Sequence, residues 1–153
     1  IKTLAKFNPK QAQIYIQTLQ SVLTNTEDTA TRVTPFFTKL DDAKAADKIS
    51  EIPAAEFAEI KAEFEDAVAS YQSNAQQLAK ASAPVRLLGV HKTLSAAYTK
   101  YAEATQLMSE AVIVAGQSVD NDKYAKSEAD QAVYLEKIHA AVGKIMNSAS
   151  MSR

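Results

Sequence analysis

The longest apolar pattern in the chain runs from Pro84 to Val119. Its inward positions recur alternately four and three residues apart, at Leu87, His91, Leu94, Tyr98, Tyr101, Thr105, Met108, Val112, Ala115 and Val119. This spacing keeps one face of an α-helix turned toward a partner. The pattern therefore predicts a helix over 84–119, which is about ten turns and about 50 Å long at about 1.5 Å of rise per residue.

Three further amphipathic stretches predict helices over 9–40, 53–81 and 122–148. Asn8 followed by Pro9 suits the start of the first helix, because Asn is a good N-cap and Pro fits the first turn. Pro53 and Pro84 open the second and third helices in the same way. The segment Asp120–Asp122 offers caps before the fourth helix.

Pro35 lies inside the pattern of the first helix. Proline in a helix interior removes one hydrogen bond and clashes with the preceding turn, so the helix either kinks near residues 31–34 or stops and restarts. Because the apolar pattern keeps its phase across Pro35, we favour one long, kinked helix.

The four helices and their short connections predict an up-down-up-down four-helix bundle, an all-α fold made of one domain over residues 1–153. The composition agrees with this class, because the 153 residues include three Gly and four Pro but neither Cys nor Trp. The helices are expected to cross at about 20°.

The charge excludes some functions. The net charge of −1 and the lack of a basic run argue against nucleic-acid binding. The segment Asp41–Asp66 is locally acidic, with nine acids against three lysines, and we interpret it as a solvated helix face. The longest apolar run, Ala111–Ala115, is far too short for a membrane span.

We call the row of inward-facing positions along a predicted helix its seam. His91 lies on the seam of the predicted helix 84–119, at a position where Leu or Ala is expected. A buried histidine needs partners for both ring nitrogens, and the tyrosines are the obvious candidates. Three interpretations follow: a satisfied structural residue, which we favour; a ligand contact together with Tyr98 and Tyr101; or a catalytic or metal-binding residue.

No catalytic constellation is evident. Glu136-x-x-His139 matches half of a di-iron signature, but the second copy is missing, so we expect no metal site and no cofactor. No serine lies in an activating motif, and Gly89, Gly116 and Gly143 are isolated rather than grouped in a phosphate-binding loop.

The segment from Pro84 to Val112 combines a proline start, His91 and the sequence Tyr-x-x-Tyr-Ala-Glu-Ala from Tyr98 to Ala104. In these features it resembles a helix of small all-helical extracytoplasmic lipoproteins of Gram-positive bacteria, over about a quarter of the chain. The resemblance implies a bundle tethered outside the membrane, although the lipidated cysteine is missing from this sequence. Because the chain opens on Ile1 rather than Met, we expect that its original start was removed, either by processing or by truncation of the sequence, which is compatible with an excised signal or a lipid-anchored leader.

Our leading functional interpretation is a non-enzymatic helical bundle that serves as a binding or structural module outside the cytoplasmic membrane, for an unknown protein or envelope component. The absence of cysteine leaves a cytoplasmic location open. One rival is a binder of a small molecule or cofactor, with a site between helices near His91, Tyr98 and Tyr101. Another is a helical assembly or secretion partner that exposes one seam to a second chain.

Overall fold

The computed structural model describes residues 8–151, with side chains placed up to Ser148. This part contains four long helices, α1 (Pro9–Ala45), α2 (Ala54–Lys80), α3 (Leu88–Ala111) and α4 (Asn121–Met151). The connections contain two 3-10 helices, η2 (Ile49–Glu51) and η3 (Val85–Leu87), and two short strands, β1 (Val112–Ile113) and β2 (Ser118–Val119). The predicted all-α fold with the helix count of a four-helix bundle is confirmed.

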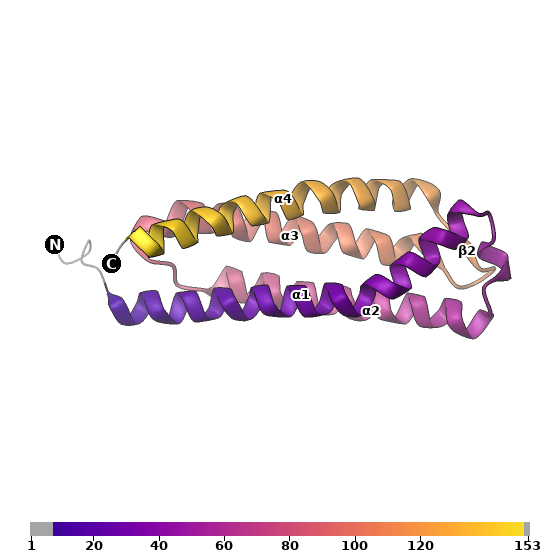
Figure 1. Cartoon of the computed structure of the whole chain (residues 1–153), viewed down its shortest axis with the longest axis horizontal. Helices are drawn as coiled ribbons and strands as arrows, with labels where there is room; N and C mark the ends of the chain where they lie inside the picture. The colour runs from indigo at the N-terminus through magenta and orange to yellow at the C-terminus, as the bar shows by residue number, and fades with distance from the viewer. Residues whose placement is uncertain (1–7, 152–153) are drawn as a thin grey trace.

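Successive helices run in opposite directions, so the bundle is up-down-up-down (Figure 1). Helix α1 packs on α2, α2 packs on α3, and α3 makes its most extensive contacts with α4. A buried hydrogen bond joins α3 and α4. Ser127 of α4 is fully buried, and its Oγ donates to the Ala104 carbonyl of α3 at 2.5 Å. The start of α1, the end of α4 and the α2–α3 connection lie at one end of the bundle, and the α1–α2 and α3–α4 connections lie at the other.

Helix α1 runs unbroken through Pro35, as predicted, and continues five residues beyond the expected end at Leu40. Asn8 caps it, because its side-chain Oδ1 accepts from the backbone N–H groups of Lys10 and Gln11. The helix changes direction in its last third (Figure 1). Pro35 explains the bend together with Thr34, whose Oγ1 donates to the Ala30 carbonyl at 2.6 Å, a back-bond that often bends helices.

The third helix is shorter than predicted, and the expectation of a helix over 84–119 is wrong at both ends. Helix α3 starts at Leu88 after η3 and ends at Ala111, and residues 112–119 form an antiparallel hairpin instead. Three consecutive β-branched residues, Val112–Val114, favour the extended backbone there. The turn then requires positive φ angles, 82° at Gly116 and 50° at Gln117.

The hairpin closes one end of the bundle. The Gln117 side-chain amide donates to the carbonyls of Ile49 and Ile52, at 2.9 and 2.6 Å, and so ties the hairpin to the connection between α1 and α2. The buried side chains form two clusters along the bundle. One surrounds Tyr15, Leu94 and Tyr98, and the other surrounds Phe57, Phe64 and Tyr124 near the hairpin.

Candidate ligand cavity

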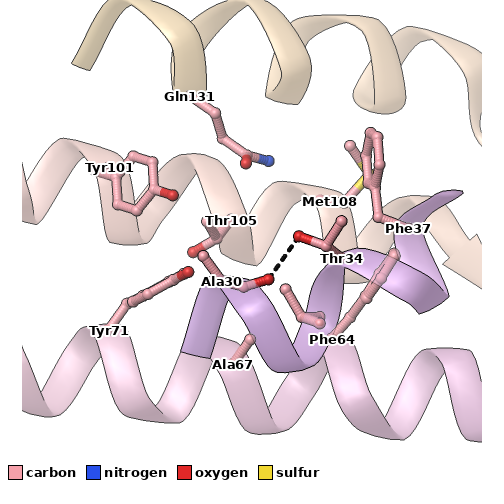
Figure 2. A pocket seen from close by; sticks show the side chains of 11 residues that line it. Ala30, Thr34, Phe37, Phe64, Ala67, Tyr71, Tyr101, Thr105, Met108 and Gln131 are labelled. Atoms are coloured by element: carbon pink, nitrogen blue, oxygen red, sulfur yellow. Dashed lines mark hydrogen bonds between the residues drawn. The ribbon is translucent and has the colours of Figure 1, made fainter. Parts of the chain in front are cut away.

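A partly open cavity of about 200 Å³ lies inside the bundle, at the junction of the two core clusters. All four helices line it, and Figure 2 shows their side chains converging on one space. Its walls are mostly apolar, with a few polar side chains among them. The lining consists of Ala30, Val33, Thr34, Phe37, Phe64, Ala67, Tyr71, Tyr101, Thr105, Met108 and Gln131.

The cavity lies where α1 bends. Four of its lining residues, Ala30, Val33, Thr34 and Phe37, come from the turns on either side of Pro35. Ala30 and Thr34 have small side chains. The inner face of the bent segment therefore leaves space between the helices that larger side chains would fill. Beyond the bend, Phe37 packs against Phe64 with ring centroids 6.5 Å apart and closes the cavity toward the hairpin.

The polar side chains of the cavity come from all four helices. Thr105 Oγ1 donates to the Ala102 carbonyl at 2.7 Å, and the Gln131 amide donates to Ser127 Oγ at 2.9 Å. The single hydroxyl hydrogen of Thr105 is therefore used within its helix, so its oxygen is left as an acceptor, whereas Gln131 keeps its amide oxygen as an acceptor and a second N–H as a donor. Gln131 extends from α4 across the cavity toward α1 (Figure 2).

Tyr71 and Tyr101 form the polar wall of the cavity, with ring centroids 5.1 Å apart. Burial is the main reason that both phenols have raised pKa values. The neighbouring Tyr101 raises the pKa of Tyr71 further, whereas Tyr71 partly offsets the rise in the pKa of Tyr101. A phenol hydroxyl can donate and accept, so the Tyr101 hydroxyl on the cavity wall is a hydrogen-bonding group that a ligand can use.

His91 lies outside the cavity, in a closed environment near the other end of α3. It is 6% exposed, its Nε2 lies 2.8 Å from the Leu78 carbonyl, and its Nδ1 lies 2.8 Å from the Tyr15 hydroxyl. A carbonyl can only accept, so Nε2 carries the hydrogen, and in the neutral ring Nδ1 accepts from Tyr15. Both nitrogens therefore have partners, as the structural interpretation of His91 requires.

Tyr98 also belongs to a satisfied internal network. Its hydroxyl lies 2.9 Å from Asn74 Nδ2, which donates to it, and 2.6 Å from Thr26 Oγ1. Thr26 Oγ1 in turn donates to the Val22 carbonyl, so the chain of hydrogen bonds ends on the backbone of α1. Of the three residues predicted to bind a ligand, the structure thus places Tyr101 on the cavity wall, Tyr98 behind it, and His91 away from it.

Among the described residues, no group of three or more potential ligating side chains could hold a metal ion. Glu136 and His139 are both exposed on α4. None of the described helices has the length and apolarity needed to cross a bilayer.

Comparison with known proteins found no matching family model, no similar curated protein and no similar solved structure. The function is therefore inferred from the chemistry of the cavity. The apolar spacing in the sequence indicates only that a lining residue such as Met108 faces the core. The signals that could have located the cavity are Pro35 beside the small residues Ala30 and Thr34, and the polar residue Gln131 on the seam of the fourth helix.

Proposed function

We propose that this chain is a binding module rather than a catalyst, and that the cavity beside Pro35 holds a small, mostly apolar molecule with one hydroxyl or carbonyl group. The observation that carries the proposal is the cavity itself, with aromatic and methionine walls and a few polar groups. Binding sites in proteins combine an apolar lining with a small number of convergent polar groups, and bundle cores can host them.

The volume limits the size of the ligand. In another protein, an engineered apolar cavity of about 150 Å³ binds benzene. A cavity of about 200 Å³ is therefore suited to a molecule of one or two rings. Phe37, Phe64 and Met108 offer it aromatic and sulfur contacts, whereas the Tyr101 hydroxyl offers a donor.

The test uses two matched probes, toluene and 4-methylphenol, which differ by one hydroxyl. Ligand-observed NMR should detect both. Ala30→Leu fills the cavity and should abolish both signals, whereas Ala132→Leu, at an exposed position on α4, should leave them unchanged. Tyr101→Phe should weaken 4-methylphenol about fivefold and toluene hardly at all, because one hydrogen bond is lost.

The proposal would be wrong if neither probe bound at millimolar concentration. It would also be wrong if Ala30→Leu remained folded by circular dichroism and still bound both probes as the wild type does. Equal weakening of the two probes by Tyr101→Phe would remove the assigned role of its hydroxyl and leave only an apolar site.

We also propose that the chain acts outside the cytoplasmic membrane. The support is the resemblance of the segment Pro84–Val112 to a helix of extracytoplasmic lipoproteins. Protease treatment of intact cells that carry the full-length protein should degrade it. Protection in intact cells, with degradation after lysis, would place it in the cytoplasm.

A further inference from the structure

The charges of this bundle are separated along its long axis. Segments 1–26, 67–102 and 137–153 together contain ten Lys and Arg residues and no Asp or Glu. The rest of the chain contains all 18 acids and only seven Lys and Arg residues. The net charge of −1 therefore hides two opposite halves.

The fold gathers the described parts of these acid-free segments at one end. The acid of each helix that lies nearest to this end is Glu27 in α1, Asp66 in α2, Glu103 in α3 and Glu136 in α4. These positions are 14 or more residues from the helix end concerned, which is about 20 Å or more of helix. We call this part of the described structure, residues 8–26, 67–102 and 137–151, the basic end.

All the Lys and Arg side chains of the basic end whose exposure the structure describes are exposed, namely Lys10, Lys80, Arg86, Lys92, Lys100, Lys137 and Lys144. Five of the six salt bridges of the described residues, such as Arg32 with Asp66 at 2.8 Å, have both partners in the other half of the bundle. The sixth joins Lys100 to Glu103 at the boundary. The field of the basic end is thus little compensated by acids of its own.

Apolar side chains are exposed at the tip of the basic end. Val85 is 72% exposed and Leu88 is 43% exposed, in the connection between α2 and α3, and Ile14 on α1 is 54% exposed. Lys80, Arg86 and Lys92 flank the first two in sequence. The basic end lies on the left in Figure 1, where α1 begins and α4 ends.

We propose that the basic end docks on an anionic lipid bilayer, with Val85 and Leu88 among the head groups and the lysines against lipid phosphates. A cationic surface that contains apolar residues matches the surface of such a membrane. The lipid phosphates attract the lysines, and the boundary between head groups and acyl chains accepts the apolar side chains. A soluble polyanion would satisfy the lysines but leave Val85 and Leu88 in water, which is why we favour the bilayer. This inference is independent of the ligand cavity.

The first experiment measures co-sedimentation of the protein with vesicles of phosphatidylcholine alone, or mixed with phosphatidylglycerol. Binding should require phosphatidylglycerol and should fall steeply between about 0.1 M and about 1 M salt, because salt screens the charges. Lys80→Gln combined with Lys92→Gln should lower the partition coefficient about thirtyfold. Lys48→Gln combined with Lys126→Gln, in the other half, should not lower it.

The second experiment places a fluorescent reporter at the tip. Because the chain contains no Trp, Val85→Trp introduces a single emitter, and Val114→Trp on the hairpin at the opposite end is its matched control. Vesicles with phosphatidylglycerol should shift the emission of Val85→Trp to the blue and leave that of Val114→Trp unchanged. Circular dichroism checks that every variant is folded.

Several outcomes would overturn the proposal. One is absence of binding to phosphatidylglycerol vesicles at low salt, and another is equal binding to neutral vesicles. Binding to heparin without binding to vesicles would assign the basic end to a soluble polyanion. Salt-sensitive self-association in ultracentrifugation, without vesicle binding, would assign it to the acidic half of a second copy.

Discussion

His91 and Tyr101 are both polar aromatic residues on the inner face of α3, ten positions apart, yet their surroundings differ. At His91 the bundle is closed, and Tyr15 and the Leu78 carbonyl occupy both ring nitrogens. At Tyr101 the bundle contains a partly open cavity of about 200 Å³, and the residue lies on its wall. The same kind of residue on the same seam is thus structural in one place and a candidate contact in the other.

Helix α1 accounts for the difference. Beside His91 it is the regular early part of the helix, and Tyr15 reaches across at 2.8 Å. Beside Tyr101 it bends around Pro35 and presents the small residues Ala30 and Thr34. A polar residue on an apolar seam therefore does not reveal its role by itself, because the backbone of the facing helix decides whether its polar atoms are satisfied.

The largest expected effect is that of His91→Ala. The substitution opens a cavity and leaves the Tyr15 hydroxyl and the Leu78 carbonyl without their partner, so the free energy of unfolding should fall by about 3 kcal/mol. Urea denaturation measures it. His139→Ala, at an exposed site on α4, should change stability by less than about 0.5 kcal/mol. A loss below about 1 kcal/mol for His91→Ala would contradict the closed environment described for this residue.

The sequence was sufficient for the architecture but not for its details. The apolar spacing located all four helices. Because the pattern keeps its phase across Pro35, it also indicated one continuous α1. The apolar spacing failed at residues 112–119, because Val112, Ala115 and Val119 still fit a helix, whereas the β-branched run Val112–Val114 and Gly116 favour a hairpin. Local backbone preference and Gln117 contacts across the bundle end outweighed periodicity there.

The site was predictable only in part, for a different physical reason. The need of His91 for partners, with tyrosines as candidates, follows from burial and chemistry alone. The cavity depends on how four helices meet at one level, and on which side chains are too small to fill the space. The apolar spacing of one helix does not show which residues of the other helices lie at the same height along the bundle. Tyr101 could therefore be named from the sequence, but Phe64 and Gln131 could not be placed beside it.

The next effect compares one hydroxyl in each environment. Tyr15→Phe removes the donor to His91 Nδ1 and leaves a buried acceptor unpaired, so it should cost about 1.5 kcal/mol. Tyr101→Phe should cost less than about 1 kcal/mol, because its hydroxyl borders a partly open cavity where water can replace it. Parallel urea denaturation of the two variants measures the difference, and equal losses would show that the two environments are alike.

The alkaline range should sharpen the same comparison. Burial raises the pKa of Tyr15 to about 12, from an ordinary value of 10.0. The folded form holds this proton more tightly than the unfolded chain, so the contribution to stability is complete below pH 10 and is lost as the pH rises through 12. Urea denaturation across this range should show a shallower decline for Tyr15→Phe than for the wild type. Identical declines would show that Tyr15 is not protected by burial.

The smallest expected effect is that of Gln131→Met in the cavity. Its amide donates to Ser127 Oγ, but Ser127 keeps its own bond to the Ala104 carbonyl, and methionine is flexible enough to fill part of the space. We expect the loss of that hydrogen bond and the gain in packing to nearly cancel, with a stability change within about 0.5 kcal/mol. A loss of about 2 kcal/mol or more by urea denaturation would mean that Gln131 is as tightly integrated as His91, and that the contrast between the closed and open sites along α3 does not hold.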